Sequence, residues 1–456
     1  MRLTVIGCGH LGATHAACMA EIGHDVLGVD IDEDRVALLN TGRAWFLEPG
    51  LDEMVSRHIR SGRLRFTTSF EEAAAFGTVH FLGVGTPGLP DSDGYDLSQV
   101  FGSVAALAPH LSGPALIIGK STVPPGTTSR LTEALRETAP AGSAVEIAWN
   151  PEFLREGHAV ADTLHPDRIV AGVPSMAAEA TVREVYRPMT EAGVPLIISD
   201  PVTAELVKGA ANAFLATKVS FINAMADICA STGADVAVLA DAVGMDQRIG
   251  RAFLTAGLGY GGGCLPKDVR GLAAFAATEG ASGAADLLAV VDDINAGRRQ
   301  QVVDLTQRLL GHLAGRRVAL WGAAFKPGTD DVRDSPGLDV ADRLYRLDAE
   351  VVVYDPQATG NALVSFPHLG YADSAAAAAY QADAVLVVTA WPEFAEIDPG
   401  ATTLTVRNPL LIDACQAVKP ARWRAAGWTV AAPFPAPDYP ERTRLTPDPA
   451  PRSRKA

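Results

Sequence analysis

Cysteine and positive charge are both scarce in this chain. Its five cysteines are widely spaced and form no Cys-x-x-Cys pair; they stand at positions 8, 18, 229, 264 and 415. This pattern predicts neither a disulfide framework nor a zinc site, so no metal is expected, and a reducing cytoplasm fits it best. The 38 Lys and Arg residues face 53 Asp and Glu residues, a formal net charge of −15. We therefore expect no nucleic-acid or anionic-membrane surface, because both require clustered cations.

The sequence also shows no long apolar run and no pattern typical of a secretory leader. The sequence passes from Met1-Arg2 directly into an apolar strand pattern, and no uninterrupted apolar run reaches the length of a membrane span. We therefore expect a cytoplasmic protein without a membrane segment. Hydrophobic residues nevertheless make up 48% of the 456 residues, which suffices for two or three domains with sizeable cores.

A strand, a glycine turn, a helix and a second strand follow one another in residues 2–30. The turn is Gly7-Cys8-Gly9-His10-Leu11-Gly12, and Asp30 ends the second strand. In a dinucleotide-binding unit, such glycines permit the tight turn, the approach to the pyrophosphate and the close packing of helix on strand. The acid would bind the ribose 2′-hydroxyl and repel a 2′-phosphate, so the sequence predicts NAD rather than NADP.

Three more apolar runs, each typical of a buried strand, alternate with helical patterns up to residue 148. Polar and turn residues follow these runs, in the segments 83–87, 120–127 and 150–157. In an open α/β sheet, ligands bind outside the carboxyl ends of the strands. We therefore expect the three segments to line one crevice with the dinucleotide.

Residues 248–268 place one cysteine after a run of glycines. Glycines at 257, 259, 261, 262 and 263 precede Cys264, and Pro266-Lys267-Asp268 follow it. Such a run indicates a loop folded tightly around a ligand, although a flexible linker with an inert cysteine is an alternative. Near lysine cations and loop amides, a cysteine thiol can have a lowered pKa, and the thiolate attacks electrophiles.

The segment from Thr203 to Ala230 has helical periodicity and no proline, which predicts one long helix. Lys208 and Asn212 lie four residues apart, so they would share one face and could both donate to a developing oxyanion. The alternative is a solvated lysine beside an unrelated asparagine, but the surroundings rich in Ala and Phe favour burial. A long apolar helix between two sheet domains also predicts a homodimer interface.

Strand and helix patterns resume at Arg316 without a second GxGxxG turn. Lys326 and Arg333 near the first turn would suit the phosphates of another nucleotide. The sequence therefore predicts an α/β protein with two Rossmann-like doubly wound domains, 1–199 and 314–432, joined by a long central helix within the helical section 200–313. The proline-rich residues 433–456 predict a disordered tail.

Seven motifs, in order, closely resemble those of the UDP-glucose/GDP-mannose dehydrogenase family. The resemblance extends to about residue 430, and the motifs comprise residues 7–12, 84–87, 120–124, 150–154, 208 with 212, 261–268 and 325–333. The resemblance implies a four-electron oxidation of a sugar C6 alcohol to a carboxylate with two NAD molecules, and UDP-glucose is the leading substrate. The alternatives are another nucleotide sugar (a UDP-N-acetylhexosamine or GDP-mannose), a two-electron hydroxyacid-type dehydrogenase and a non-catalytic nucleotide-sugar binding protein.

The resemblance also implies roles for individual residues. In the catalytic set, Cys264 would carry a thiohemiacetal and then a thioester, with Lys208, Asn212, Asp268, Glu152 and Thr122 as oxyanion donors and water-positioning groups. The cofactor would contact Gly7, Gly9, His10, Leu11, Gly12, Asp30, Arg35, Val84, Gly85, Thr86, Ser121, Thr122, Glu156, Lys267 and Arg333. The sugar nucleotide would contact Glu152, Phe153, Leu154, Glu156, Lys208, Asn212, Arg248, Phe253, Tyr260, Gly261 and Lys326.

Two positions bear on the partner and on the substrate. By its place in the family pattern, Arg248 could reach the site of the partner subunit in a homodimer. The family usually has Asp-x-Arg-Asn near the last strand, whereas this chain has Asp413-Ala414-Cys415-Gln416. A cysteine thus stands where the family has an arginine that contacts the substrate, and the identity of the sugar stays open.

Overall fold

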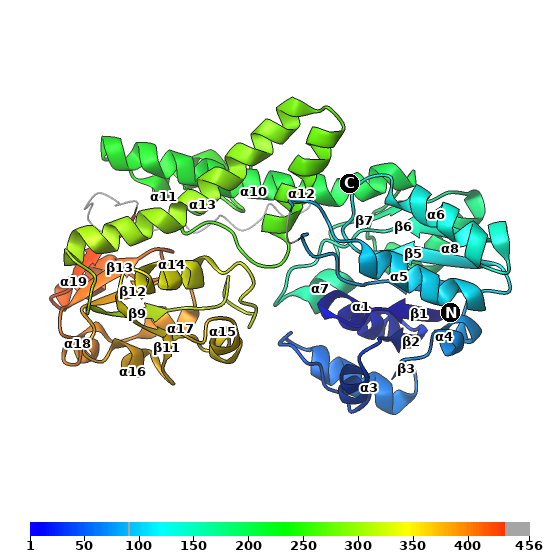
Figure 1. Ribbon diagram of the computed structural model, residues 1–456, viewed down its shortest axis with the longest axis horizontal. Helices are drawn as coiled ribbons and strands as arrows, with labels where there is room; N and C mark the ends of the chain where they lie inside the picture. The colour runs from blue at the N-terminus through cyan, green and yellow to red at the C-terminus, as the bar shows by residue number, and fades with distance from the viewer. Residues whose placement is uncertain (90–91, 434–456) are drawn as a thin grey trace, which may run out of the picture.

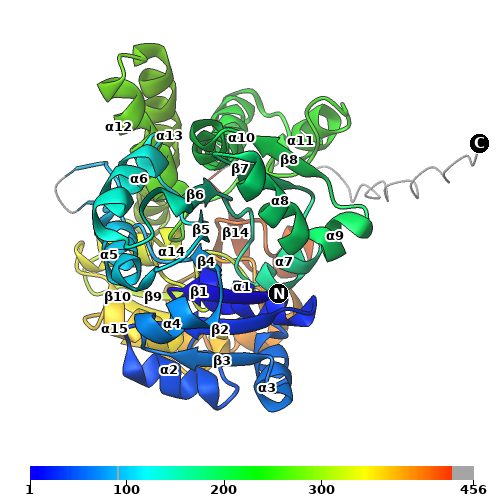
Figure 2. The ribbon, with the colours of Figure 1, turned by 90° about the vertical axis from the view of Figure 1, so that its right-hand side faces the viewer.

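The computed structural model describes residues 1–89 and 92–433. Two α/β domains lie side by side beneath a group of long helices (Figure 1). The predicted disordered tail lies outside the described residues, except for Pro433. In Figure 2, which faces the amino-terminal domain, α5 and α6 lie on one side of its strands and α7 and α8 on the other.

The amino-terminal sheet has eight strands in the order β3-β2-β1-β4-β5-β6-β7-β8. Its core covers both faces, because successive side chains of a strand point to opposite sides: Leu3 and Val5 pack into one cluster and Ile6 into another. The strands are β1 (Arg2–Ile6), β2 (Asp25–Val29), β3 (Leu64–Thr67), β4 (Val79–Leu82), β5 (Ala115–Gly119), β6 (Val145–Trp149), β7 (Ile169–Gly172) and β8 (Leu196–Ser199). Its helices are α1 (His10–Glu21), α2 (Glu33–Asn40), α3 (Leu51–Ser61), α4 (Phe70–Phe76), α5 (Ser98–Leu107), α6 (Thr127–Thr138), α7 (Ala159–Leu164), α8 (Met176–Val185) and α9 (Arg187–Glu191).

One strand pair departs from the expected parallel sheet. β6 and β7 are antiparallel, with Trp149 opposite Gly172, while every other pair in this sheet is parallel. The connection between them reaches the other domain, where Lys326 Nζ lies 2.6 Å from the carbonyl oxygen of Glu156. Because this segment extends outward instead of crossing back over the sheet, the chain returns in the opposite direction.

The carboxyl-terminal sheet has six parallel strands in the order β11-β10-β9-β12-β13-β14. Both sheets thus contain the Rossmann order 3-2-1-4-5-6, as the sequence predicts, and ligands of such sheets bind where the order reverses. The strands are β9 (Arg317–Trp321), β10 (Glu350–Tyr354), β11 (Gly370–Tyr371), β12 (Ala384–Val387), β13 (Leu410–Asp413) and β14 (Thr429–Ala431). The helices are α14 (Pro336–Tyr345), α15 (Thr359–Ser365), α16 (Ala375–Ala379), α17 (Pro392–Glu396), α18 (Pro399–Thr403) and α19 (Pro420–Ala425).

Four helices connect the two sheets: α10 (Pro201–Thr232), α11 (Val236–Gly244), α12 (Leu265–Thr278) and α13 (Ser282–Leu310). The predicted long helix is confirmed, and it runs without a break past Gly209. Asp200 caps its start by accepting from Thr203 N at 2.9 Å, and Gly233, with a φ of +74°, ends it. α10 packs against β7, α12 and α13, and α13 packs against α14 of the other domain.

Among the described residues, α10 is the one helix long and apolar enough to cross a membrane by length and composition. In the structure, 39% of its most apolar window is buried. The helix also carries buried polar residues on the side that faces the protein: Glu205, Lys208, Asn212, Ser220 and Asn223. A core helix meets the same length and composition criterion, so the helix is no evidence of a membrane span.

A buried carboxylate joins α10 to the loop that contains Thr122. Glu205 is 1% exposed, and its carboxylate accepts from Gly126 N and Thr128 N, both at 2.6 Å. These N–H groups belong to the start of α6, which no capping side chain of its own satisfies. Glu205 therefore acts as an external cap that fixes the 120–127 loop against the helix carrying Lys208.

Replacing Glu205 with alanine should lower the free energy of unfolding by about 3 kcal/mol, because buried donors lose their acceptor. Urea denaturation followed by circular dichroism measures the change. Glu191→Ala is the matched control, since that side chain is 72% exposed, and it should change stability by less than about 0.5 kcal/mol. Equal losses in the two variants would contradict the capping role.

Candidate active site

The glycine turn after β1 leaves room for a ligand at the start of α1. Gly7 has a φ of +85°, and a Cβ on Gly12 would lie 1.7 Å from the Gly7 carbonyl oxygen. A Cβ on Gly9 would meet nothing within 4 Å, and no side chain caps α1. The N–H groups of the first helical turn are therefore available to an anion, and this cradle fits the pyrophosphate of NAD.

Asp30, at the end of β2, faces the same turn. Its carboxylate accepts from Cys8 N at 2.7 Å and from Arg35 Nη1 at 3.1 Å. The Arg35 guanidinium also lies 4.7 Å from the centre of the Trp45 ring. Arg35 is thus held by Asp30 and an aromatic face, and the carboxylate beside the turn suits a ribose hydroxyl better than a 2′-phosphate.

His10 opens α1 and lies against the aromatic rings of the loop that precedes α3. Its ring centre is 4.9 Å from that of Trp45 and 4.0 Å from that of Phe46. Burial, together with the charge of Arg333, lowers the pKa of His10 to about 4, so the ring is neutral at pH 7. Leu11 follows it, half-buried.

Two further loops meet at the carboxyl edge of this sheet. Ser121 Oγ donates to the Val84 carbonyl oxygen at 2.6 Å, and Thr86 Oγ1 donates to that of Thr122 at 2.8 Å. Gly85 lies between Val84 and Thr86. The structure therefore brings the segments 83–87 and 120–127 together, beside the glycine turn that precedes α1.

Four side chains of the expected catalytic set form two pairs. Lys208 Nζ lies 2.9 Å from Glu152 Oε1, and Asn212 Nδ2 donates to Asp268 Oδ2 at 2.6 Å. Lys208, Asn212 and Asp268 are buried. Lys267, expected to bind the cofactor, places Nζ 2.6 Å from the other oxygen of Asp268. The helical spacing of Lys208 and Asn212 thus puts an ammonium and an amide on one buried face of α10.

The charges around Lys208 keep it protonated. Burial alone would lower the pKa of Lys208, but the carboxylates of Glu152 and Asp268, together with the Cys264 sulfur where it ionises, outweigh burial, and the pKa lies above its usual value. At neutral pH the side chain is therefore a cation. A preorganised cation of this kind stabilises an oxyanion that forms next to it.

Cys264 immediately precedes α12, and its side chain is exposed. Surrounding protein atoms still desolvate the sulfur and raise the pKa of the thiol to about 11; Lys208 lowers it, while Glu152 and Asp268 raise it. The expectation of a lowered thiol pKa is therefore wrong for this state of the protein. Lys208 does lower the pKa of the thiol, but desolvation and the two carboxylates raise it by more.

A cavity of about 240 Å³ opens beside Leu265, the residue after Cys264. Four residues that the resemblance assigns to the sugar nucleotide line it: Phe253, Tyr260, Gly261 and Lys326. Phe253 has a φ of +65°, a left-handed conformation that is costly for a bulky residue and that clusters at ligand sites.

The glycine run contacts protein as well as the cavity. A Cβ on Gly262 would lie 2.8 Å from the Phe325 ring, and one on Gly263 would lie 2.4 Å from Arg333 Cζ. Gly262 N also donates to the Arg333 carbonyl oxygen at 2.9 Å. The expectation of a loop folded around a ligand therefore needs a correction, because Gly262 and Gly263 serve close packing on the carboxyl-terminal domain.

Three residues expected to bind cofactor or substrate bond to one another between the domains. Lys326 Nζ donates to the Glu156 carbonyl oxygen at 2.6 Å, and Arg333 Nη2 lies 3.1 Å from Glu156 Oε1. Arg333 also pairs with Asp331 at 2.6 Å. Burial, reinforced by Asp331, raises the pKa of Glu156, while Arg333 opposes this shift. In the next segment upstream, Phe153 lies under the Arg168 guanidinium at 3.9 Å and Leu154 N donates to Glu152.

Arg248 is the one expected contact that the described chain does not bring to the site. Its side chain is 89% exposed and pairs with Asp246 at 2.6 Å, outside the cavity lining. Cys415, which replaces the family arginine, is half-buried and donates to the Val387 carbonyl oxygen at 3.5 Å. Its Cα lies 3.9 Å from a Cβ built on Gly257, so the substitution borders the loop that leads to the cavity.

Lys120 and Asn150 also belong to this region, although the sequence patterns assign them no role. Lys120 is 7% exposed and donates to Asn150 Oδ1 at 2.9 Å. Two aromatic residues are likewise not expected from the sequence: Trp45, whose ring lies against the Arg35 guanidinium, and Phe325, which lines the cavity. A lysine directly after an apolar strand is a usable signal, because a charge at that place is buried at the carboxyl edge of the sheet.

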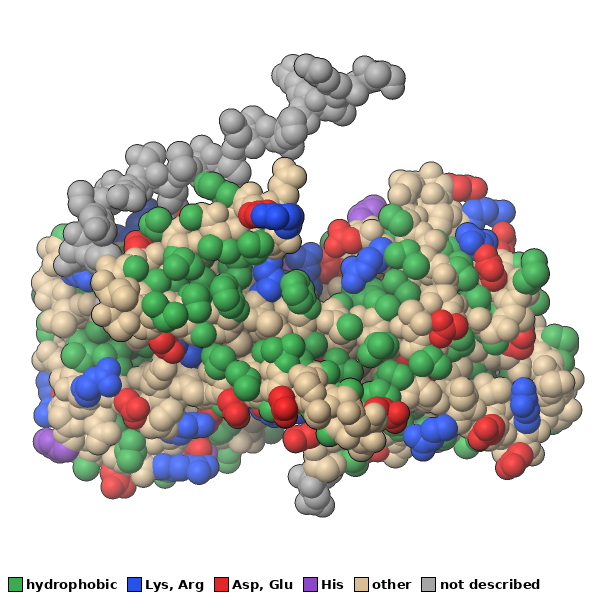
Figure 3. Space-filling model, turned by 90° about the horizontal axis from the view of Figure 1, so that it is seen from above, with side chains coloured by type: hydrophobic (Ala, Val, Ile, Leu, Met, Phe, Trp, Pro, Cys, Tyr) green, Lys and Arg blue, Asp and Glu red, His purple; other side chains and the backbone are tan. Residues whose placement is uncertain are grey.

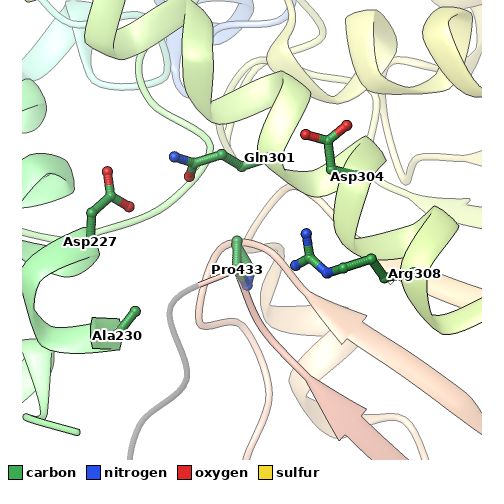
Figure 4. Close-up of a pocket in the computed structure, with 6 residues that line it drawn as sticks. All are labelled: Asp227, Ala230, Gln301, Asp304, Arg308 and Pro433. Atoms are coloured by element: carbon green, nitrogen blue, oxygen red, sulfur yellow. The ribbon is translucent and has the colours of Figure 1, made fainter. Parts of the chain in front are cut away.

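A second hollow, of about 200 Å³, lies away from these residues between α10 and α13. Figure 4 shows Asp227 and Ala230 from α10, Gln301, Asp304 and Arg308 from α13, and Pro433 around it. None of them belongs to the expected site. Asp227 is paired with Arg298 at 2.5 Å.

Sequence models of three domains from one family match this chain. The NAD binding domain of the UDP-glucose/GDP-mannose dehydrogenase family matches residues 1–190, its central domain residues 202–297 and its UDP binding domain residues 319–420. The chain belongs to this family. The resemblance seen in the seven motifs is thereby confirmed.

Individual members of the family agree with this assignment. UDP-glucose 6-dehydrogenase AglM of Haloferax volcanii is 44% identical over 408 residues, 87% of this chain and 93% of its own length. A UDP-glucose 6-dehydrogenase of Rhizobium meliloti is 40% identical over 416 residues, covering 91% and 94%. The solved UDP-glucose dehydrogenase of Pyrobaculum islandicum superposes with a TM-score of 0.87 at 36% identity, covering 95% of this chain and 97% of that one.

The alkylation rate of Cys264 tests the raised pKa of its thiol. Because the thiolate is the reactive form, the rate with iodoacetamide should rise about tenfold per pH unit from pH 7 to 10 without a plateau. Lys208→Met should slow the reaction further, since it removes the charge that lowers this pKa. Mass spectrometry of the peptide measures the rate, with Cys264→Ser as the labelling control. A plateau below pH 9 would contradict the burial argument.

Proposed function

We propose that the chain is an NAD-dependent dehydrogenase that oxidises the C6 hydroxyl of UDP-glucose to a carboxylate. The observation that carries the proposal is the set of groups around Cys264: the Lys208–Glu152 pair, the Asn212–Asp268 pair and the adjoining cavity. Oxyanion donors, a nucleophile and carboxylates are the groups that a four-electron oxidation through a covalent intermediate requires. NAD held at the glycine turn would accept the hydride of each oxidation.

The residues of the chain divide the remaining work. Lys208 and Asn212 hold the oxygen of the reacting carbon as negative charge develops on it. After the first oxidation, the sulfur of Cys264 adds to the aldehyde carbon, and its proton must leave because the resting thiol is protonated. Glu152 and Asp268 are the carboxylates placed to take protons. The family resemblance adds Thr122, which would position water together with Glu152.

The covalent intermediate forms and breaks down at the sulfur of Cys264. The C–S bond formed in the addition gives a thiohemiacetal, whose loss of a hydride and of the hydroxyl proton gives a thioester. Water then attacks the thioester carbon, the C–S bond breaks, and the carboxylate leaves while the thiol is restored. The overall change per sugar is the loss of four electrons, taken up as two hydrides, and the gain of one water oxygen.

Two observations support UDP-glucose over other nucleotide sugars. The relatives at 40% and 44% identity are named UDP-glucose 6-dehydrogenases, whereas a structurally similar UDP-D-ManNAc dehydrogenase of Pyrococcus horikoshii is only 25% identical. Cys415 is the feature that keeps the alternative sugars open, because it stands where the family has an arginine that contacts the substrate. A non-catalytic binding protein would not need the buried oxyanion donors.

We also propose a homodimer that buries one face of α10. Phe214, Phe221 and Ile228 recur every seven residues on this helix and are 66%, 47% and 54% exposed. Figure 3 looks onto the central helices and shows hydrophobic side chains gathered there. A patch of this kind on one long helix is typical of a subunit interface. The exposed Arg248 would then be free to reach the site of the partner subunit.

A cytoplasmic location belongs to the same proposal. All five cysteines are free thiols in the structure. Thiols that stay reduced are the rule in the cytosol, and the proposed reaction needs the one at position 264 reduced.

The stoichiometry of the reaction tests the proposed chemistry. Wild-type protein with NAD and UDP-glucose should form two NADH per UDP-glucuronate, read by absorbance and by chromatography of the acid, and a panel of UDP- and GDP-sugars tests the substrate. Cys264→Ser should lose at least about 100-fold in acid formation while still binding NAD, because the thioester cannot form. One NADH per turnover, or an active Cys264→Ser variant, would favour a two-electron dehydrogenase. Tight binding of a nucleotide sugar without NAD reduction would favour a binding protein.

Substitutions that introduce charge into the proposed interface test the homodimer. Phe214→Asp with Phe221→Asp should halve the mass seen in size-exclusion chromatography with light scattering, because a buried carboxylate in an apolar interface is costly. Leu404→Asp is the control, since Leu404 is 87% exposed in the other domain. A wild-type protein that runs as a monomer would rule the homodimer out.

A further inference from the structure

Lys120 is a buried ammonium group that the proposed reaction does not use. It follows β5 and is 7% exposed. Its Nζ donates to Asn150 Oδ1 at 2.9 Å and to the Asn150 carbonyl oxygen at 3.3 Å. Within the described ranges, no carboxylate pairs with it. A cation held only by neutral acceptors lowers the stability of the fold. Stability therefore does not explain why a lysine occupies this position.

Asn150 links Lys120 to the site. Its side chain donates to the Val170 carbonyl oxygen at 2.6 Å and accepts from the Tyr186 hydroxyl at 2.5 Å. Its own N–H donates to the Gly119 carbonyl oxygen at 2.7 Å. Pro151 and Glu152 follow it directly, so the position of Asn150 sets where the chain leaves β6 and where Glu152 meets Lys208.

The charges that face Lys120 come from several elements. Glu152, after β6, favours the ammonium form, and Lys208 of α10 disfavours it; burial is the largest influence and lowers the pKa of Lys120 to about 8. His15 of α1 has a pKa well below its usual value because it is buried, and burial raises the pKa of Tyr186, so both are neutral at pH 7. The charge of Lys120 thus interacts with Glu152, as that of Lys208 does, but without a direct ion pair.

We propose that Lys120 is a positioning residue that, through its bonds to Asn150, fixes the loop carrying Glu152. The inference rests on the proposed function, because it assigns Lys120 to the general-base steps of that reaction. It also explains why a cation is kept at a place where the fold alone would favour an apolar side chain.

Lys120→Met tests the proposal directly. We expect kcat to fall at least about 10-fold, with the KM values for NAD and UDP-glucose changing less than about threefold, because the change acts on proton transfer and not on binding. The loss of kcat should persist at saturating NAD and UDP-glucose, because it reflects the placement of Glu152 and not the affinity for substrates. A wild-type kcat in this variant would overturn the proposal.

Two further variants separate the hydrogen bond of Lys120 from general support of the fold. Lys120→Gln can still donate to Asn150 Oδ1, so it should restore most of the kcat that Lys120→Met loses; a kcat as low as that of Lys120→Met would overturn the positioning role. Tyr186→Phe removes the other bond to Asn150 Oδ1 and leaves Lys120 in place. It should lower the Tm more than it lowers kcat, and a kcat as low as that of Lys120→Met would overturn the assignment to Lys120.

The Tm of Lys120→Met distinguishes a positioning role from a purely structural one, because a structural support that is removed lowers the Tm. Lys120→Met removes a buried cation without a carboxylate partner, so its Tm at pH 7 should equal or exceed that of the wild type while activity falls. Parallel losses of Tm and kcat would mean that Lys120 is only a structural support. The NADH count of the wild-type enzyme stands apart from these tests. If the wild type forms no NADH, the proposed function fails, whereas normal turnover of the wild type with an equal kcat in Lys120→Met defeats only the present inference.

Discussion

The buried pair of Lys208 and Glu152 is the interaction on which the arrangement of this site depends. Lys208 belongs to α10 and Glu152 to the segment after β6, so the pair joins the central helix to the amino-terminal sheet at 2.9 Å. A charge in the interior costs stability unless it is paired and hydrogen-bonded. The pair therefore demands a rigid surrounding, which Glu205 supplies through the cap on α6 and Asn150 through its bonds at the end of β6.

The sequence alone could predict those features that arise from neighbouring residues. The uninterrupted α10 follows from helical periodicity without proline, and the pairing of Lys208 and Asn212 on one face follows from their spacing of four. The glycine turn was recognisable because strand, turn, helix and acid occur in one order. The structure gives Gly7 and Gly12 a steric reason, such as the 1.7 Å clash that a side chain on Gly12 would cause. Local geometry determines all of these features.

The features that sequence could not predict depend on contacts between distant segments. The antiparallel β7 results from a connection that reaches Lys326 in the other domain. The thiol pKa of Cys264 depends on burial and on Glu152, more than a hundred positions away, so counting nearby lysines gave the wrong direction. Gly262 and Gly263 pack on Phe325 and Arg333, which no pattern within the glycine run reveals.

The contact between the domains adds a constraint on any ligand. Lys326 and Arg333, whose charges suit phosphates, are already bonded to the backbone oxygen and the carboxylate of Glu156. A phosphate that binds these cations would replace a neutral carbonyl oxygen at Lys326 and a carboxylate at Arg333, so neither cation has to be desolvated from a fully hydrated state. The burial cost of the cations is already borne by the protein, while Glu156, whose pKa is raised by burial, is released. The same contact that holds the two sheets together in the free chain thus keeps its phosphate-binding groups in place.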